Sequence, residues 1–75
     1  MAEERIRIEI GFDGGQIMAA LTTIASADGL EQALASGADG GFALDAEDGH
    51  YTVVLHRIVY VKRFARESRV GFGAV

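Results

Sequence analysis

The 75-residue chain contains no cysteine, no proline and no tryptophan. Without cysteine it can form neither a disulfide framework nor a thiolate metal site, and a chain this short buries a small fraction of its unfolded surface. Small domains that lack such cross-links commonly gain stability from a partner subunit. The absence of proline means that no internal linker is marked, so we expect one domain over residues 1–75.

The sequence also lacks a long apolar run. No stretch approaches the roughly 20 apolar residues that span a bilayer. The opening MAEERIRIEI alternates charges where a signal peptide needs a basic region followed by an apolar one. Apolar residues make up 49% of the chain, which argues against intrinsic disorder. We therefore expect a soluble, cytoplasmic protein that does not bind membranes.

Positive charge is scarce and lies mostly near the C-terminus. Residues 1–55 hold two arginines against ten acids, a balance of −8, whereas residues 56–75 hold five cations against Glu67 alone, a balance of +4. Together these give the formal net charge of −4. Such an asymmetry can steer either an anionic partner or a second copy of the same chain.

Alternation of apolar with polar residues predicts a strand over residues 5–12. Its apolar members are Ile6, Ile8, Ile10 and Phe12. Asp13-Gly14-Gly15 favours a tight turn, after which residues 17–24 are expected to return antiparallel. The inward side chains of that second strand are either Ile17, Ala19 and Leu21 or the opposite set, and a helix beginning here is the competing interpretation.

The stretch SADGLEQALASG, residues 26–37, predicts a short helix. Ser26 or Asp28 can cap its amino end, and Asp28 with Glu31 has the spacing of a capping box. Gly37 suits the carboxyl end because glycine readily adopts a left-handed conformation. The expected inward stripe consists of Leu30, Ala33 and Leu34. The pattern leaves open whether the helix starts at Ser26 or several residues earlier.

Residues 40–55 predict a second hairpin, with its turn at residues 47–49. After a break at His56-Arg57, residues 58–64 predict a fifth strand. Strict alternation places one set of its side chains on one face, namely Ile58, Tyr60, Lys62 and Phe64, and the other set on the opposite face, namely Val59, Val61 and Arg63. The predicted order ββαβββ describes an α+β fold in which one short helix packs on one face of a small antiparallel sheet.

No set of residues predicts catalysis or cofactor binding. Asp45, Glu47 and Asp48 crowd one turn but lack the ligand series of an EF-hand. His50 and His56, with no cysteine beside them, give at best an incomplete zinc site. FDGGQ lacks the lysine and the spacing of a phosphate-binding loop, and no serine has an accompanying histidine and acid. We therefore expect a protein that is not an enzyme and that holds no cofactor or metal.

The C-terminal extension, residues 64–75, combines cations with apolar residues. Val70 and Phe72 are two positions apart, the spacing with which a short added strand inserts side chains into a neighbour's groove. Burial of such a side chain is worth about 1.5–3 kcal/mol. We expect a homodimer whose interface includes Arg63, Phe64, Arg66, Arg69, Val70 and Phe72. The acids expected to pair with these cations are Glu3, Glu4, Asp45 and Glu47.

The same segment supports an alternative function, in which cations hold phosphates while aromatic rings stack on bases. The residues expected to contact nucleic acid are Tyr60, Lys62, Arg63, Phe64, Arg66 and Arg69. The negative net charge of the chain weighs against this alternative. The first functional hypothesis is therefore a self-associating protein-interaction module, and the alternative is a nucleic-acid-binding accessory protein.

Four short stretches follow one another over about residues 5–61, and they read IRIEIG, ADGLEQALASG, LDAEDGHYTVV and RIVYV. In this order they resemble a family of small actinobacterial proteins known only as a domain of unknown function. The resemblance implies a compact ββαβββ-type fold and implies no activity, cofactor or catalytic residue. Residues 62–75 depart from that pattern, so we expect the extension to be a feature of this protein.

Overall fold

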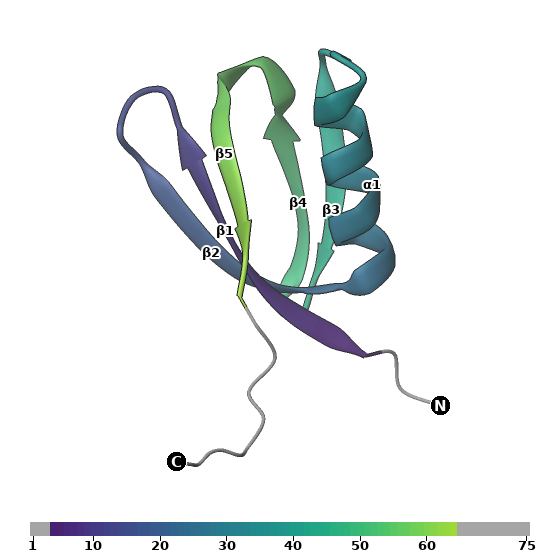
Figure 1. Ribbon diagram of the computed structural model, residues 1–75. Helices are drawn as coiled ribbons and strands as arrows, with labels where there is room; N and C mark the ends of the chain where they lie inside the picture. Colours follow the sequence, from purple (N-terminus) through teal and green to yellow (C-terminus); the bar gives the residue numbers. More distant parts are fainter. Residues whose placement is uncertain (1–3, 65–75) are drawn as a thin grey trace, which may run out of the picture.

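Five strands and one helix follow one another along the chain in the predicted order. The computed structural model describes residues 4–64. Its elements are β1 (Arg5–Phe12), β2 (Ile17–Thr23), α1 (Ile24–Ala35), β3 (Gly41–Ala46), β4 (Gly49–Val54), the 3₁₀ turn η1 (Leu55–Arg57) and β5 (Ile58–Arg63). All neighbouring strands are antiparallel, in the order β4-β3-β2-β1-β5. Because α1 packs on one face of this sheet (Figure 1), the predicted α+β fold is confirmed.

The core lies between α1 and the face of the sheet that α1 covers. Its fully or almost fully buried apolar side chains are Ile8, Ile10, Ala27, Leu30, Leu44, Val53 and Leu55. Ala33 and Leu34 are half-buried and pack against this cluster, so the predicted apolar stripe of the helix is confirmed. Since each large buried side chain contributes about 1.5–3 kcal/mol, this layer of contacts is the main source of stability.

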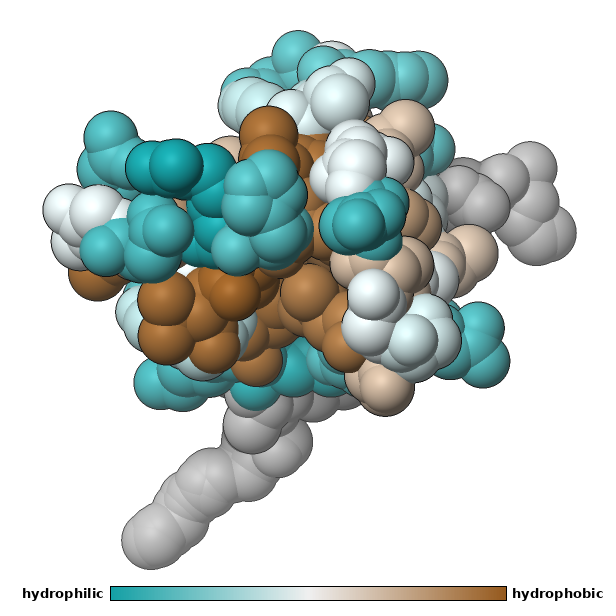
Figure 2. All heavy atoms as spheres, turned by 90° about the horizontal axis from the view of Figure 1, so that it is seen from above, coloured by the Kyte–Doolittle hydropathy of each residue, from teal (hydrophilic) through white to brown (hydrophobic). Residues whose placement is uncertain are grey.

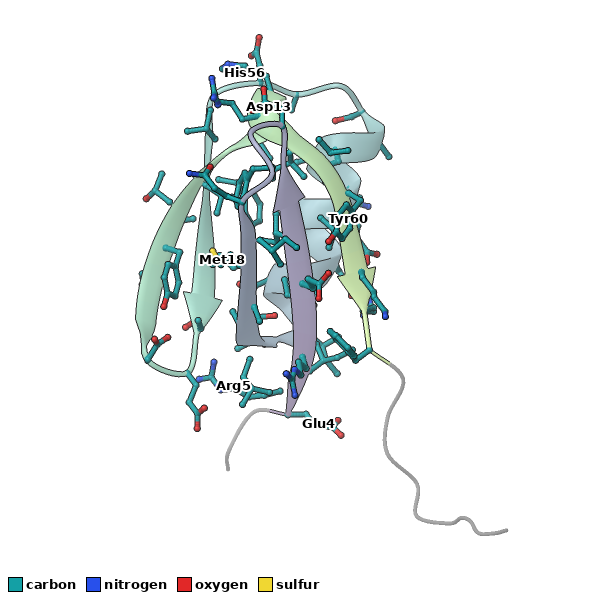
Figure 3. All side chains as sticks on the ribbon, turned by 90° about the vertical axis from the view of Figure 1, so that its left-hand side faces the viewer. Glu4, Arg5, Asp13, Met18, His56 and Tyr60 are labelled. Atoms are coloured by element: carbon teal, nitrogen blue, oxygen red, sulfur yellow. The ribbon has the colours of Figure 1, made fainter. Side chains whose placement is uncertain are left out.

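β2 and β3 meet at one end of the sheet and separate toward the other. β1 pairs with β2 along its length, whereas β2 and β3 share a single pair, Thr22 with Ala46. The Glu47 N–H donates to the Leu21 carbonyl at 2.8 Å and extends this contact by one position. Beyond it the two strands diverge, and Met18 lies between them (Figure 3).

The connection from β4 to β5 joins the two edge strands across one end of the sheet. The Leu55 N–H donates to the Gly40 carbonyl, and the Asp13 N–H donates to the Arg57 carbonyl, both at 2.9 Å. The Arg57 guanidinium also lies 3.3 Å from the Asp13 carboxylate. Leu55 is buried, so η1 closes the core at this end, and the predicted break at His56-Arg57 is confirmed.

The amino end of α1 is capped by Thr23, the last residue of β2. The Thr23 Oγ1 accepts a hydrogen bond from the Ser26 N–H at 3.0 Å. The predicted caps, Ser26 or Asp28, are therefore wrong, as is the capping box of Asp28 with Glu31. Thr23 takes this role because its extended backbone places the hydroxyl over the first turn of a helix that follows the strand directly. The Ser26 hydroxyl instead accepts from the Asp45 N–H at 3.0 Å and ties the helix to β3.

The carboxyl end of α1 is closed by Gly37, as predicted. Gly37 has a φ of +76°, a conformation that glycine adopts without steric cost. The Gly37 N–H donates to the Leu34 carbonyl at 3.1 Å, and the Ala38 N–H donates to the Ala33 carbonyl at 3.0 Å. These bonds satisfy carbonyls that the last helical turn leaves without partners.

β5 contains an extra residue that breaks the alternation predicted for residues 58–64. Gly11 pairs with Tyr60 whereas Phe12 pairs with Ile58, so Val59 is left over as a β-bulge. The predicted faces are therefore wrong in part. Ile58, Val61 and Arg63 share the side that faces α1, and Tyr60 and Lys62 point to the other side.

Candidate interaction surface

The face of the sheet opposite α1 carries no helix within the described residues, and we call it the open face. Strand alternation points its side chains away from the core. They are Arg5, Arg7, Glu9 and Gly11 of β1, Ile17, Ala19 and Leu21 of β2, Ala43 and Asp45 of β3, His50, Thr52 and Val54 of β4, and Tyr60 and Lys62 of β5. Figure 3 looks onto this face, with α1 behind the strands.

β2 lies in the middle of the sheet and has no charged residue, yet its larger aliphatic side chains point outward. Ile17 is 64% exposed and Leu21 is 41% exposed. The inward set contains Met18, Ala20 and the fully buried Thr22. Residues 17–23 thus form a strand, and the competing prediction of a helix is wrong. Of the two inward sets that the sequence left open, the structure has Met18, Ala20 and Thr22, so Ile17, Ala19 and Leu21 point outward. The more apolar side of a central strand faces solvent.

Apolar side chains also gather at the end of the molecule that carries the β1–β2 turn (Figure 2). Ile17 begins β2 at this end, Val54 ends β4, and Val59 is the bulged residue of β5. All three are more than 40% exposed. Because Ile17 belongs to both regions, the apolar part of the open face continues around this end.

Tyr60 is held in one position on the open face. Its hydroxyl donates to the Glu9 carboxylate at 2.6 Å, and this hydrogen bond raises the pKa of Tyr60. Its ring lies over Gly11, where a Cβ atom would collide with the ring carbons. Glycine is therefore required for this close approach, and the aromatic ring covers backbone that a side chain would otherwise cover.

Phe64 forms a cluster with two cations at the edge of the same face. The Arg7 guanidinium lies 5.0 Å from the centre of the Phe64 ring, and the Lys62 ammonium lies 4.7 Å from it. The Phe64 N–H donates to the Arg7 carbonyl at 3.0 Å, which continues the pairing of β5 with β1 by one residue. Cation–π contacts at such distances stabilise the cluster modestly and leave both charges available to an anion.

Arg63 lies on the other side of β5 and binds the helix. Its guanidinium donates to Asp28 at 2.6 Å and to the two carboxylate oxygens of Glu31 at 3.0 and 3.1 Å. These hydrogen bonds raise the pKa of Arg63 further above its already high value. Asp28 and Glu31, which the sequence suggested as a capping box, thus provide a docking site for the last residue of β5.

Acidic side chains collect where β3 turns into β4. The Asp45 carboxylate lies 4.0 Å from the Arg5 guanidinium and 3.7 Å from the His50 imidazole. The Tyr51 hydroxyl donates to Asp48 at 2.7 Å, which raises the pKa of Tyr51. Glu47 is exposed between Asp45 and Asp48.

The structure separates the predicted contact residues into three groups. Tyr60, Lys62 and Phe64 lie together on the open face, and Arg63 lies opposite them against α1. The remaining predicted residues lie outside the described residues, namely Arg66, Arg69, Val70, Phe72 and the acid Glu3. Glu4, Asp45 and Glu47 are all within the described chain, and the partners of Arg63 are different acids, Asp28 and Glu31.

Three residues of the open face were missed at the level of sequence, Arg7, Ile17 and Leu21. Alternation predicts no more for Arg7 than a polar position in a strand, and it does not choose between the two orientations of β2. The available signal was the composition of β2: a seven-residue strand without charge, in which either face would be apolar.

Within residues 4–64 no three His, Asp or Glu side chains come close enough together to hold a metal ion. The same part of the chain contains no helix that is long and apolar enough to cross a membrane. Comparisons of the chain with protein-family models, with curated proteins and with solved structures gave no match. Function is therefore argued from the geometry of the open face.

Proposed function

We propose that this protein is a small interaction module without catalytic activity, which associates with a second copy of itself through the open face. The observation that carries the proposal is the orientation of β2, because Ile17 and Leu21 point away from the core on an uncovered face. A scattered exposed aliphatic residue is ordinary, but these two lie on the middle strand, with only Ala19 between them on that side.

The limited thickness of the fold supports the proposal. The chain has one helix within the described residues, and this helix covers one face of the sheet. The sheet and α1 form two packed layers, and a second copy on the open face would add a third. Closed twofold symmetry is the commonest arrangement of such homo-oligomers, and it requires a surface that is complementary to itself.

We extend the proposal to the C-terminal extension. Phe64 lies at the edge of the open face, so the chain continues toward residue 75 from a position beside the proposed contact. Arg66, Arg69, Val70 and Phe72 would then add charge pairs and apolar contacts to a neighbouring copy. Arg63 is left out of this contact because Asp28 and Glu31 already bind it.

Solution mass tests the proposal. Light scattering of the full chain should give the mass of a dimer, and Leu21→Ser should give a monomer at the same concentration. Ile24→Ser is the matched control, since Ile24 is a similarly exposed aliphatic residue that begins α1 and lies off the open face. A chain ending at Phe64 should dimerise more weakly. A monomeric full chain, or a Leu21→Ser variant that stays dimeric, would contradict the proposal.

The cluster of Phe64 with Arg7 and Lys62 supports a second candidate, a nucleic-acid-binding accessory protein. Tyr60 lies on the same two strands, so aromatic rings and cations share one region of an uncovered sheet. Single-stranded and double-stranded probes of mixed sequence should then bind at low salt and dissociate steeply as salt rises. Arg7→Ala should weaken binding, whereas Arg57→Ala, at the opposite end of the sheet, should not. Absence of binding at low salt would exclude this candidate.

A further inference from the structure

Four residues of the open face lie in one line across the sheet. Arg7 pairs with Leu21, and the Glu47 N–H donates to the Leu21 carbonyl at 2.8 Å. The Phe64 N–H donates to the Arg7 carbonyl at 3.0 Å. The line therefore runs Phe64, Arg7, Leu21, Glu47. The neighbours of Leu21 in this line are a cation, Arg7, toward β1 and an acid, Glu47, toward β3.

Arg7 and Glu47 are the two charged residues of this line, and Glu9 lies two residues from Arg7 on the same face of β1. Within residues 4–64 neither Arg7 nor Glu47 forms an ion pair, although Arg7 contacts the Phe64 ring. Glu47 is the first turn residue after β3, and its backbone hydrogen bond to Leu21 holds it in register with Leu21 at the end of β3. Both side chains are exposed.

The spacing of the two charges about Leu21 fits one symmetry operation. Neighbouring strands are about 4.8 Å apart, so Arg7 and Glu47 lie at nearly equal distances on either side of β2. A twofold axis that runs along β2 between two facing sheets exchanges these sides. It places Arg7 of one copy opposite Glu47 of the other, twice, with Leu21 facing Leu21. A twofold axis that crosses the strands at this line would instead bring Arg7 against Arg7.

We propose that two copies pack face to face about a twofold axis along β2, with Arg7 of each copy paired to Glu47 of the other. The inference rests on the proposed function and deepens it, because it names the arrangement of the self-contact. Ile17, Ala19 and Leu21 form its uncharged centre, and the two Arg7–Glu47 pairs flank that centre. Charge pairs at such positions select the register and exclude wrong partners more than they add affinity.

Charge reversal tests the arrangement directly. Arg7→Glu and Glu47→Arg should each be monomeric at a concentration at which the unmodified chain is dimeric, because each homodimer would hold two like-charge pairs. A one-to-one mixture of the two variants should give the mass of a dimer, since every pair in the mixed dimer is then of opposite charge. The double variant, with both changes in one chain, should dimerise by itself, which also shows that these substitutions permit folding.

Asp39→Arg is the matched control for Glu47→Arg, because it makes the same charge change at an exposed site outside the open face. Asp39→Arg should stay dimeric by itself, because Arg7 and Glu47 are unchanged, and in a mixture with Arg7→Glu it should form no mixed dimer. If the unmodified chain is dimeric but the reversals have no effect, or the mixture stays monomeric, the arrangement is overturned and the proposed function stands. If the unmodified chain is monomeric, both are overturned.

Discussion

The two faces of the sheet use their aliphatic side chains in opposite ways. On the covered face Ile8, Ile10 and Leu44 are fully buried against α1 and its neighbours. On the open face Ile17 and Leu21 retain 64% and 41% of their exposure, although they belong to the strand in the middle of the sheet. The covered face thus forms the core that holds the chain folded, whereas the aliphatic side chains of the open face contribute little to that core.

The largest effect should follow from truncation on the covered face. Leu30→Ala should lower the free energy of unfolding by about 2–5 kcal/mol, because Leu30 is fully buried and a cavity would remain. Leu21→Ala should change it by less than about 1 kcal/mol in dilute protein, where association does not contribute. Urea unfolding at low concentration gives both values. Equal losses for the two variants would abolish the distinction between the faces.

An intermediate effect is expected at Gly11, where the Tyr60 ring covers part of the open face. Gly11→Ala should lower the free energy of unfolding by about 1–3 kcal/mol, because the new methyl group collides with the Tyr60 ring. In a Tyr60→Ala background the same substitution should cost much less. A double-mutant cycle measured by thermal unfolding isolates this coupling, and additive effects would show that the ring does not constrain position 11.

A smaller effect is expected at the junction of β5 with the helix. Arg63→Lys should lower the free energy of unfolding by about 0.5–1 kcal/mol at low salt, since a lysine cannot reproduce the forked contact with Asp28 and Glu31. Lys62→Arg is the control, on the open face, and should be neutral. Urea unfolding at low and high salt measures the difference, and a loss that does not shrink with salt would argue against the ion pairs.

The smallest effect concerns ionisation of the tyrosines. The pKa of Tyr60 is raised above its usual 10.0, first by the hydrogen bond to Glu9. The neutral phenol is thus favoured in the folded state, so its contribution to stability is complete below pH 10 and is lost as the pH rises through the folded-state pKa. Absorbance of phenolate should show both tyrosines titrating above their usual range, and Glu9→Ala should return only Tyr60 toward 10. No change on Glu9→Ala would contradict the assigned hydrogen bond.

Local sequence patterns were sufficient for most of the fold. Alternation in residues 5–12 predicted β1, because one side of that strand is apolar and the other is polar. Gly37 predicted the end of the helix through its backbone freedom, and the charged turn at residues 47–49 predicted the second hairpin. In each case the signal and the structure involve the same few consecutive residues.

The errors arose where contacts between distant residues decide the outcome. Thr23 caps α1 in place of the predicted Ser26 or Asp28, because β2 leads directly into the helix. The Ser26 hydroxyl accepts a hydrogen bond from the Asp45 N–H of β3 instead. The bulge at Val59 depends on the pairing of β5 with β1. The orientation of β2 could not be read from its own residues, because both of its sides are uncharged.

The surface that we propose for self-association could be predicted only in part. Phe64 was expected in the interface and Lys62 only in a nucleic-acid contact. Both lie on the open face, and their neighbour Arg7 comes from a strand far away in sequence. The alignment of Arg7, Leu21 and Glu47 becomes visible once the register of three strands is known.

Cross-linking at a single introduced cysteine tests the central claim most directly, because the chain has no cysteine of its own. Ala19→Cys places the thiol on β2, in the proposed contact, and Ala35→Cys places it on the exposed surface of α1. With a short bis-maleimide, Ala19→Cys should give a covalent dimer and Ala35→Cys should remain a single chain. The claim that the open face binds a second copy would be contradicted if only Ala35→Cys gave a covalent dimer, or if neither variant gave one.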